Sequence, residues 1–249
     1  MLMNACYVIL YRESTYDSYR LRNIKFVVTY LKQIPNLDIL IIEQDSKETV
    51  IKQFCNDNNI QYAFIKNAGL FNRAWAFNCF HNFTNAKRVI LGDGDIIVDK
   101  SVIARTISAL HDYDIVRPYS GYVNDLSNDD TLRLINEGRF VDVNLRNIFN
   151  FSGGVCAFRT DSFYNILGGF DERFEGWGGE DDEMHIRIFE HSFDKLSLTS
   201  SNQHALHMFH KRTQLDGNQQ PNYLKNVSYI RDGKRNDGIQ QIGNINRYV

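Results

Sequence analysis

The sequence predicts an α/β protein with a mainly parallel central sheet flanked by helices. Short runs rich in Val, Ile and Tyr alternate with longer amphipathic stretches through the first half of the chain, a pattern typical of βα units. A chain of 249 residues can build one large core, and no repeat or low-complexity tract marks a second unit. We therefore predict a single domain over residues 1–249, with a polar C-terminal extension at 211–249.

Strands and helices are expected in alternation as far as residue 117. The strands fall at 5–11, 38–43, 61–65, 88–91 and 114–117, and the helices at 19–33, 47–58, 71–83 and 101–110. The polar stretch from there to about residue 150 has no clear period and is not assigned. Glycines are frequent from residue 151 onward, which indicates tight turns and close approach of the backbone to a ligand.

Charge and composition exclude several classes of partner. A formal net charge of -2 gives no electrostatic reason to bind nucleic acid. The apolar segment 1–11 lacks a basic start and is too short to cross a bilayer, so it is assigned to the first strand. The four cysteines have no paired spacing, which favours reduced thiols. We expect a cytoplasmic protein without a transmembrane segment, and peripheral association with the inner face of a membrane stays open.

Two carboxylates directly follow the strand at 88–91. Asp93-Gly94-Asp95 lies where ligands bind in open α/β sheets, outside the carboxyl ends of the strands. Carboxylates beside a glycine offer hard oxygen ligands and leave room for a diphosphate. An ordinary turn is the alternative, because Asp and Gly are common turn residues. The position after Val89-Ile90-Leu91 favours a site for Mn²⁺ or Mg²⁺.

A tryptophan between glycines precedes a run of four acids. Trp177 is followed by two glycines and then by Glu180, Asp181, Asp182 and Glu183, which open an amphipathic stretch. Acids in a first helical turn also offset the helix dipole without any catalytic role. That explanation leaves the tryptophan unexplained, and we favour a flat surface for a sugar ring over a side chain turned into the core. Asp181 is then the candidate general base.

Three histidines fall within seven residues. On a straight strand His204 and His210 would share one face and His207 the other, so all three could meet one metal only if the strand bends. A single histidine is more often structural, but this density favours a metal ligand.

Several residues at strand ends and helix starts could contact a nucleotide. An arginine there could bind phosphate, and an acid at the end of the second strand could contact a nucleobase. A surface arginine and a helix cap are the alternatives. The candidates are Arg12, Glu43, Phe71 and Arg73.

These motifs, in this order, resemble the metal-dependent glycosyltransferases of the GT-A fold, of the inverting family 2/7 type, and most closely the β-1,4-galactosyltransferase group. The tryptophan-glycine-glycine-acid string is specific, and the other motifs gain weight from their order. The resemblance covers roughly residues 7–210. It is carried by Phe71-Asn72-Arg73-Ala74, Asp93-Gly94-Asp95, Phe151-Ser152-Gly153-Gly154-Val155 and Gly176-Trp177-Gly178-Gly179-Glu180-Asp181-Asp182.

The resemblance implies a role for each of these motifs. Asp95 would bind the metal, with Asp93 beside the metal and the ribose, and Asp181 would be the base. The animal enzymes have a Met and a His three residues apart on their metal-binding strand, and His204 and His207 resemble that pair; we expect His207 as second ligand, with His204 and His210 as alternatives. The remaining expected contacts are Arg12, Glu43, Phe71, Arg73, Asp93 and Gly94 for the nucleotide, and Gly153, Gly154, Trp177, Glu180 and Asp182 for the donor or acceptor sugar.

The expected activity is inverting, metal-dependent transfer of a hexose or N-acetylhexosamine from a UDP-sugar to a hydroxyl of a saccharide or glycolipid acceptor, in surface-glycan synthesis. A nucleotidyltransferase acting on sugar phosphates is an alternative, but it would need a Lys- or Gly-rich phosphate loop that the first strand does not lead into. A non-catalytic glycan-binding module with the Trp177 platform is the other alternative. The sequence does not name the sugar, because related sugars differ by single groups.

Overall fold

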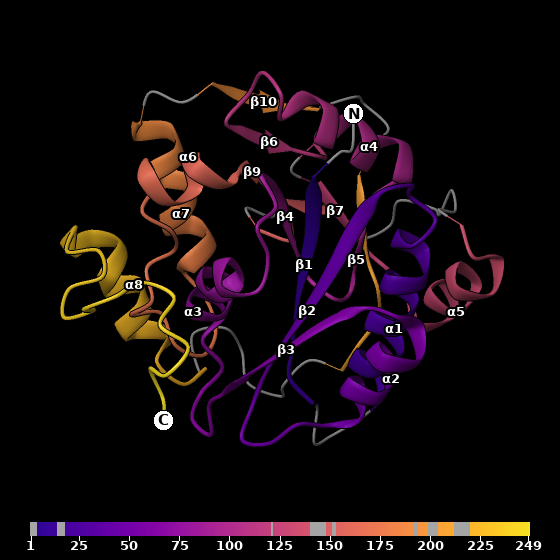
Figure 1. Cartoon of the computed structure of the whole chain (residues 1–249), viewed down its shortest axis with the longest axis horizontal. Helices are drawn as coiled ribbons and strands as arrows, with labels where there is room; N and C mark the ends of the chain where they lie inside the picture. Colours follow the sequence, from indigo (N-terminus) through magenta and orange to yellow (C-terminus); the bar gives the residue numbers. More distant parts are fainter. Residues whose placement is uncertain are drawn as a thin grey trace.

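The protein has a central sheet covered by helices on both faces (Figure 1). The computed structural model describes residues 4–13, 18–120, 122–139, 148–150, 153–191, 194–198, 204–211 and 220–249. The predicted fold class, α/β with a mainly parallel sheet flanked by helices, is confirmed.

The central sheet has seven strands in the order β10-β6-β9-β4-β1-β2-β3. Strands β1 to β4 are parallel, β9 runs antiparallel to both of its neighbours, and β10 pairs in parallel with β6. The strands are β1 Ala5–Tyr11, β2 Leu37–Asp45, β3 Gln61–Lys66, β4 Arg88–Gly92, β6 Ile115–Arg117, β9 Val155–Arg159 and β10 Lys195–Ser197.

A second sheet of four strands carries the histidine segment to the end of β4. Its order is β5-β11-β7-β8, and in it His207 pairs with Ile96, the residue after Asp95. The pairing therefore sets the histidines beside the Asp93-Gly94-Asp95 turn. The strands are β5 Ile96–Ile97, β7 Tyr122–Asp125, β8 Ile148–Asn150 and β11 Ala205–His207.

Two hydrophobic cores lie on opposite faces of the central sheet. One core packs beneath α1, α2, α4 and α5, and the other beneath α3, η1, α6 and α7. Helix α8 lies beyond α7, on the outside of the second core (Figure 1). The helices are α1 Tyr19–Leu31, α2 Val50–Asn58, α3 Arg73–Asn78, η1 Cys79–Asn82, α4 Lys100–Ala109, α5 Asn128–Glu137, α6 Thr160–Asn165, α7 Glu180–Glu190 and α8 Tyr223–Asp232.

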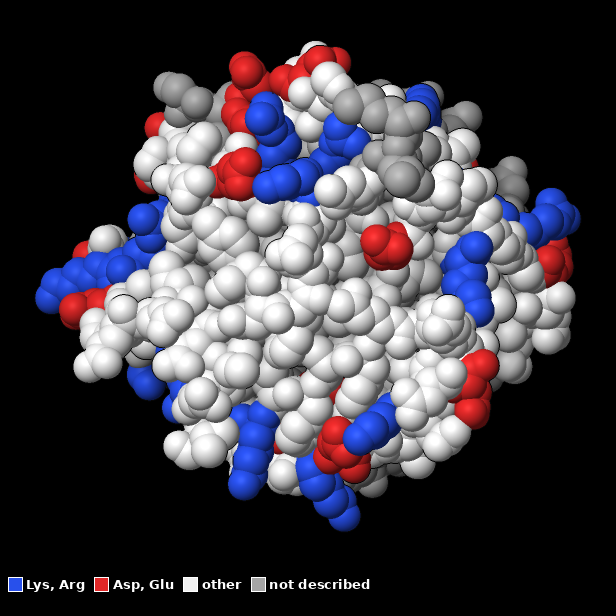
Figure 2. All heavy atoms as spheres, in the orientation of Figure 1, with Lys and Arg blue, Asp and Glu red and all other residues white. Residues whose placement is uncertain are grey.

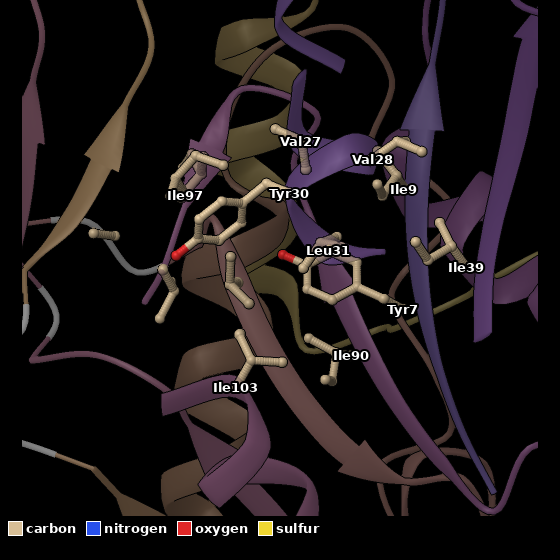
Figure 3. Packing of buried hydrophobic residues seen from close by; sticks show 14 of the residues in the cluster. Tyr7, Ile9, Val27, Val28, Tyr30, Leu31, Ile39, Ile90, Ile97 and Ile103 are labelled. Atoms are coloured by element: carbon tan, nitrogen blue, oxygen red, sulfur yellow. The ribbon is translucent and has the colours of Figure 1, made fainter. Parts of the chain in front are cut away.

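Strand β1 shows why the strands in the first half of the chain can be predicted from the sequence. Successive side chains on a strand point to opposite faces, so Tyr7 and Ile9 enter one core while Cys6 and Val8 enter the other. A strand buried on both faces is a continuous apolar run. Figure 3 shows the first core from close by, with Tyr7 and Ile9 meeting side chains of α1, among them Leu31.

Local capping moves two predicted helix boundaries. The helix expected at 71–83 begins instead at Arg73, because the Asn72 side chain caps it by accepting the Trp75 backbone N–H at 2.8 Å, and it continues after Asn78 as a 3-10 turn. The helix expected at 47–58 begins at Val50, because Thr49 is extended. The unassigned polar stretch contains β7 and α5.

Residues 220–249, expected as a polar extension, are packed against α3. The Trp75 indole N–H donates to the Asn244 carbonyl at 2.8 Å, and the Trp75 and Tyr248 rings meet edge to face at 4.8 Å. Arg247 pairs with the buried Glu172 at 2.9 Å. This part of the chain therefore contributes to the second core.

The surface carries charges of both signs. The face in Figure 2 has Lys, Arg, Asp and Glu scattered around a largely uncharged centre, with no field of one sign. Among the residues that the structure describes, no helix combines the length and the apolar character needed to cross a membrane. All four cysteines are free thiols.

Candidate active site

Asp95, His207 and His210 converge beyond the end of β4. One ligand atom from each lies within 4.8 Å of the others. The Asp95 carboxylate is 3.9 Å from Nε2 of His207 and 3.4 Å from Nε2 of His210. A carboxylate oxygen and two imidazole nitrogens at this spacing form a candidate site for a divalent transition metal.

The end of strand β11 brings His210 into this group. The strand stops at His207, after which Met208 donates its backbone N–H to the Asp95 carbonyl at 2.7 Å and Phe209 donates to the Thr131 hydroxyl at 2.8 Å. The chain therefore turns, and His210 reaches the same side as His207.

His204 is not part of the group. Its Nδ1 lies 3.3 Å from the Ser120 hydroxyl, and its ring meets Tyr122 edge to face at 6.1 Å. The expectation that His204 and His210 share a face was wrong, because it assumed a straight strand through all seven residues. Of the two alternatives, the structure brings His210 to Asp95 and His207.

Hydrogen bonds to the other ring nitrogens orient both imidazoles. Nδ1 of His210 lies 3.0 Å from the Lys211 carbonyl, which can only accept, so Nδ1 carries the proton and Nε2 presents its lone pair. Nδ1 of His207 lies 2.7 Å from the Asp125 carboxylate, with the same consequence. A carboxylate behind a ligating histidine fixes its tautomer and raises its basicity.

The charge states also suit a metal. Burial, despite Asp95, lowers the pKa of His210, which favours the neutral imidazole that a metal requires. Burial alone would raise the pKa of Asp95, but His207, His210 and Arg20 hold it below its ordinary value. The group therefore presents a carboxylate at Asp95 and a neutral nitrogen ligand at His210.

Arg73 joins a second cluster of carboxylates to the same strand end. Its guanidinium lies 3.0 Å from Asp93, 2.6 Å from Asp181 and 3.6 Å from Glu180. Arg73 begins α3, Asp93 follows β4, and Glu180 and Asp181 begin α7. Asp93, expected beside the metal, is thus held by Arg73 and lies outside the Asp95 group.

One arginine faces three acids in this cluster, and the pKa values of two of the acids are raised. Burial, only partly offset by Arg73, raises the pKa of Asp93 to about 6. Burial and the neighbouring Asp181 raise the pKa of Glu180 to about 7. Burial opposes the charge of Arg73, but Asp181, Asp93 and Glu180 outweigh it and raise its pKa. The cluster is therefore an acidic site built around a permanently charged arginine.

Gly153 and Gly154 allow the chain to pass between these carboxylates. A Cβ on Gly153 would lie 1.9 Å from Oδ2 of Asp181, so only glycine fits there without a shift. Gly154 has a φ of +86° and accepts the Asp93 backbone N–H at 2.8 Å. Gly153 therefore lies against Asp181 and Gly154 against Asp93, and the sugar pocket expected at these glycines stays a prediction.

A cavity of about 290 Å³ opens beside Asp181. It runs between α7 and the sheet, with Asp181, Gly153 and Gly154 at one end and Phe189 at the other. Arg117 also lines it, 3.0 Å from Nδ1 of His185. The candidate base is therefore open to a cavity.

Trp177 lies on the surface, and its side chain is 54% exposed. It stacks on Tyr223 with ring centroids 5.7 Å apart and an interplanar angle of 30°. The preference for a surface platform over a core side chain agrees with this placement. Asp182, on the first turn of α7, is also exposed.

Arg12 and Glu43 already have protein partners in this structure. Arg12 donates to the carbonyls of Gln44, Asn67 and Gly69, each at 2.7 Å, and stacks over Phe71 at 5.4 Å.

Glu43 is buried and accepts from the hydroxyls of Tyr62 and Thr49, each at 2.5 Å. Both side chains therefore fix the chain at the ends of β2 and β3, and their contact with a nucleotide stays a prediction. A Cβ on Gly94 would meet Ile9 and Ile24 at 3.4 Å, an ordinary contact, so packing does not require glycine there.

Sequence reasoning missed Asp125, Arg117 and Tyr223. Asp125 lies within the polar stretch that was not assigned, Arg117 ends the strand before it, and Tyr223 is in the segment expected as an extension. Their roles depend on contacts across many residues of chain, for which the local sequence carries no signal.

Known galactosyltransferases resemble this chain in part of its sequence and in its fold. A family model described as the N-terminal domain of galactosyltransferase matches residues 142–211. No curated protein matches the chain. Among solved structures, the catalytic domain of Drosophila β1,4-galactosyltransferase 7 in complex with xylobiose is similar, with 17% identity, a TM-score of 0.53, and coverage of 92% of this chain and 79% of that one.

Two further structures share the fold. S. aureus TarS 1–349 in complex with UDP-GlcNAc has 11% identity and a TM-score of 0.60, over 91% of this chain and 65% of that one. GalNAc-T7 with UDP, GalNAc and Mn²⁺ has 15% identity and a TM-score of 0.59, over 91% of this chain and 47% of that one, so this chain spans about half its length.

These likenesses establish the GT-A fold, as the resemblance predicted. In fold, and over residues 142–211 in sequence, the chain is similar to glycosyltransferases.

Proposed function

We propose that this protein transfers a hexose or N-acetylhexosamine from a UDP-sugar to a hydroxyl of a saccharide acceptor, with inversion at the sugar carbon. One observation carries the proposal: the Asp95, His207 and His210 group and the candidate base Asp181 meet at the end of β4, joined through Asp93 and Arg73. A metal-held diphosphate and an acceptor base at one strand end are the parts that a direct displacement requires.

The donor set fits Mn²⁺ better than Mg²⁺. Two imidazole nitrogens beside one carboxylate are uncommon for Mg²⁺, which prefers oxygen ligands and retains water. Asp95, His207 and His210 would hold the ion and leave coordination positions for the two phosphates. A bound divalent cation would offset the charge that develops on the departing diphosphate.

Asp181 is proposed as the general base. Its position on the first turn of α7 fixes it beside Gly153, and its Oδ1 accepts from Arg73 at 2.6 Å. The second oxygen, Oδ2, is then the one that can accept the acceptor proton, while the hydrogen bond from Arg73 orients the carboxylate. Asp93, on the other side of Arg73, would face the donor ribose.

The acceptor sugar is proposed to stack on Trp177. Glu180 and Asp182 lie on the turn that follows and would accept hydrogen bonds from its hydroxyls, while Gly153 and Gly154 would allow the donor sugar to approach the backbone. The relatives' complexes with UDP-GlcNAc, with UDP and GalNAc, and with xylobiose support a UDP-sugar donor and a saccharide acceptor.

A screen of nucleotide sugars tests this function. A donor that binds the folded state raises its melting temperature, and the proposal requires that the rise depend on Mn²⁺. Transfer is then measured with the stabilising donor. Asp181→Asn should fold, bind the donor and lose at least about 100-fold in transfer rate, since general-base catalysis contributes about 10²- to 10⁴-fold.

Glu190→Gln, at the exposed far end of the same helix, is the matched control and should keep wild-type activity. Stabilisation by nucleotide sugars without any transfer or hydrolysis would favour the glycan-binding module, and release of pyrophosphate from a nucleoside triphosphate would favour the nucleotidyltransferase. Full activity of Asp181→Asn would remove the assignment of the base.

A further inference from the structure

We propose that helix α8 is part of the acceptor site, with Tyr223 and Asn226 as positioning residues that hold Trp177 in place. The inference rests on the proposed function and extends it to a segment that the sequence marked as an extension. Helix α8 lies beside α7 in Figure 1.

Asn226 fixes the backbone of the loop that carries Trp177. Its side chain is 1% exposed, and its amide Nδ2 lies 3.0 Å from the Glu175 carbonyl, 3.0 Å from that of Gly178 and 3.4 Å from that of Trp177. Three carbonyls of one loop thus converge on one side chain of α8. Hydrogen bonds made by a buried amide are costly to lose, because the carbonyls are left without a donor.

Tyr223 supports the tryptophan ring itself. The two rings stack at 5.7 Å and 30°, so Tyr223 covers one face of the Trp177 indole. The indole remains 54% exposed, which leaves the opposite face for a ligand. A Cβ on Gly178 would already meet the Tyr223 ring at 3.4 Å, so the loop and the helix are in close contact.

The contacts repeat along one face of α8. Helical residues that are three or four positions apart face the same side, and Tyr223, Asn226 and Tyr229 follow each other at intervals of three. Tyr229 meets Phe174 edge to face at 5.6 Å, and Asp232 pairs with Arg173 at 3.0 Å. Helix α8 therefore contacts the chain from Arg173, before the loop, to the carbonyl of Gly178.

The loop needs this external support because its own backbone is permissive. Gly176, Gly178 and Gly179 have φ values of +76°, +93° and +95°, a region that glycine enters without cost and leaves as easily. A tryptophan between such residues has no local reason to keep one orientation. Since Gly179 immediately precedes α7, the loop also sets where the first turn of that helix begins.

Loosening this support should weaken acceptor binding and spare the donor site. The Asp95 group lies on the other side of Arg73 and shares no described contact with α8. We expect Tyr223→Ala and Asn226→Ala each to raise the acceptor KM about tenfold, equivalent to about 1.4 kcal/mol of binding. Metal-dependent hydrolysis of the UDP-sugar without acceptor should stay within about twofold of wild type.

Matched variants separate this role from a general loss of stability. Tyr223→Phe keeps the ring and should restore the wild-type acceptor KM. Leu224→Ala changes the neighbouring residue, whose side chain is 77% exposed, and should leave KM unchanged. A rise in KM with Tyr223→Phe equal to that with Tyr223→Ala, or an equal rise with Leu224→Ala, would overturn the role of the stacked ring.

Tryptophan fluorescence tests the same support without any activity. The chain has two tryptophans, and Trp75 is fully buried, so quenching by acrylamide reports on Trp177. Tyr223→Ala and Asn226→Ala should increase the quenching constant by about half or more, and Leu224→Ala should not. Unchanged quenching in both variants would overturn the proposal.

The two assays fail separately. If the wild-type protein neither transfers nor hydrolyses any nucleotide sugar, the proposed function fails, while increased quenching would still support α8 as the holder of Trp177. If the wild type is active and the variants show increased quenching with unchanged acceptor KM, Trp177 does not bind the acceptor through this support, and the inference is overturned.

Discussion

Replacing Gly153 by alanine should abolish most of the activity through the displacement of Asp181. The added Cβ would stand 1.9 Å from Oδ2 and 2.5 Å from Cγ of Asp181. To restore a contact of even 3.0 Å to Oδ2, the carboxylate must move by about 1.1 Å, and its bond to Arg73, now 2.6 Å long, must lengthen. A misplacement of about 1 Å can cost on the order of 100-fold in rate.

The assay is single-turnover transfer at saturating donor, with thermal unfolding as a check on folding. We expect Gly153→Ala to lose about 100-fold in rate while the melting temperature falls by only a few degrees, because overpacking typically costs about 1–3 kcal/mol. The effects of two substitutions that act through the same group do not add. The double variant with Asp181→Asn should therefore be no slower than Asp181→Asn alone. Wild-type rates for Gly153→Ala, or full additivity in the double variant, would refute Asp181 as the displaced base.

Three further predictions concern the metal, the acid cluster and the platform. Asp125→Ala should weaken Mn²⁺ binding about 10- to 100-fold by freeing the His207 ring, measured by calorimetry, and His204→Ala should leave binding unchanged. The folded chain holds the Glu180 proton more tightly than the unfolded chain, so the free energy of unfolding should fall as pH rises from about 4.5 to about 7. Glu180→Gln should therefore raise the melting temperature at pH 8 but hardly at pH 4. Trp177→Ala should raise the acceptor KM with little change in donor hydrolysis, and an unchanged KM would exclude the platform.

The first half of the fold was predictable because its signals are local. Strands β1, β2 and β4 are largely buried on both faces, and the edge strand β3 buries one face. All four contain apolar runs, and their predicted limits agree with the structure to within one or two residues. The Asp93-Gly94-Asp95 turn and the first turn of α7 were found for the same reason. A short motif next to a strand or helix with a clear sequence pattern can be placed in the fold from that pattern alone.

Helix α5 has boundary signals in its sequence, although it lies in the stretch that was not assigned. Helix α5 has Ser127 as its N-cap, accepting from Asp130 at 3.1 Å, acids in its first turn and Gly138 at its end. Each of these is a recognised boundary signal. Most residues of the helix are polar, and Leu134 is the residue that it buries in the first core, so the apolar pattern is weak.

The remaining features depend on long-range contacts. The choice between His204 and His210 depends on strand β11 ending at His207, which its pairing with β5 and β7 decides. The link between Arg73 and Asp181 joins residues 108 positions apart, and no local pattern predicts it. Arg73, which the sequence assigned to the nucleotide, thus pairs with Asp93, Glu180 and Asp181.

Arg73 consequently has a central place in the proposed site. It pairs with both Asp93, which we propose lies beside the donor, and Asp181, which we propose lies beside the acceptor. Charge-assisted, partly buried hydrogen bonds of this kind are short and strongly directional. The orientation of the base and the position of the donor strand end are therefore coupled through one guanidinium group.

The account depends most on where a divalent cation binds. The direct measurement is the anomalous diffraction of a crystal grown with Mn²⁺ and UDP. We predict one peak in bonding distance of the Asp95 carboxylate and of Nε2 of both His207 and His210, with the diphosphate of UDP completing the shell. A peak bound by other residues, or UDP bound away from Asp95 with no metal beside it, would contradict the proposed site.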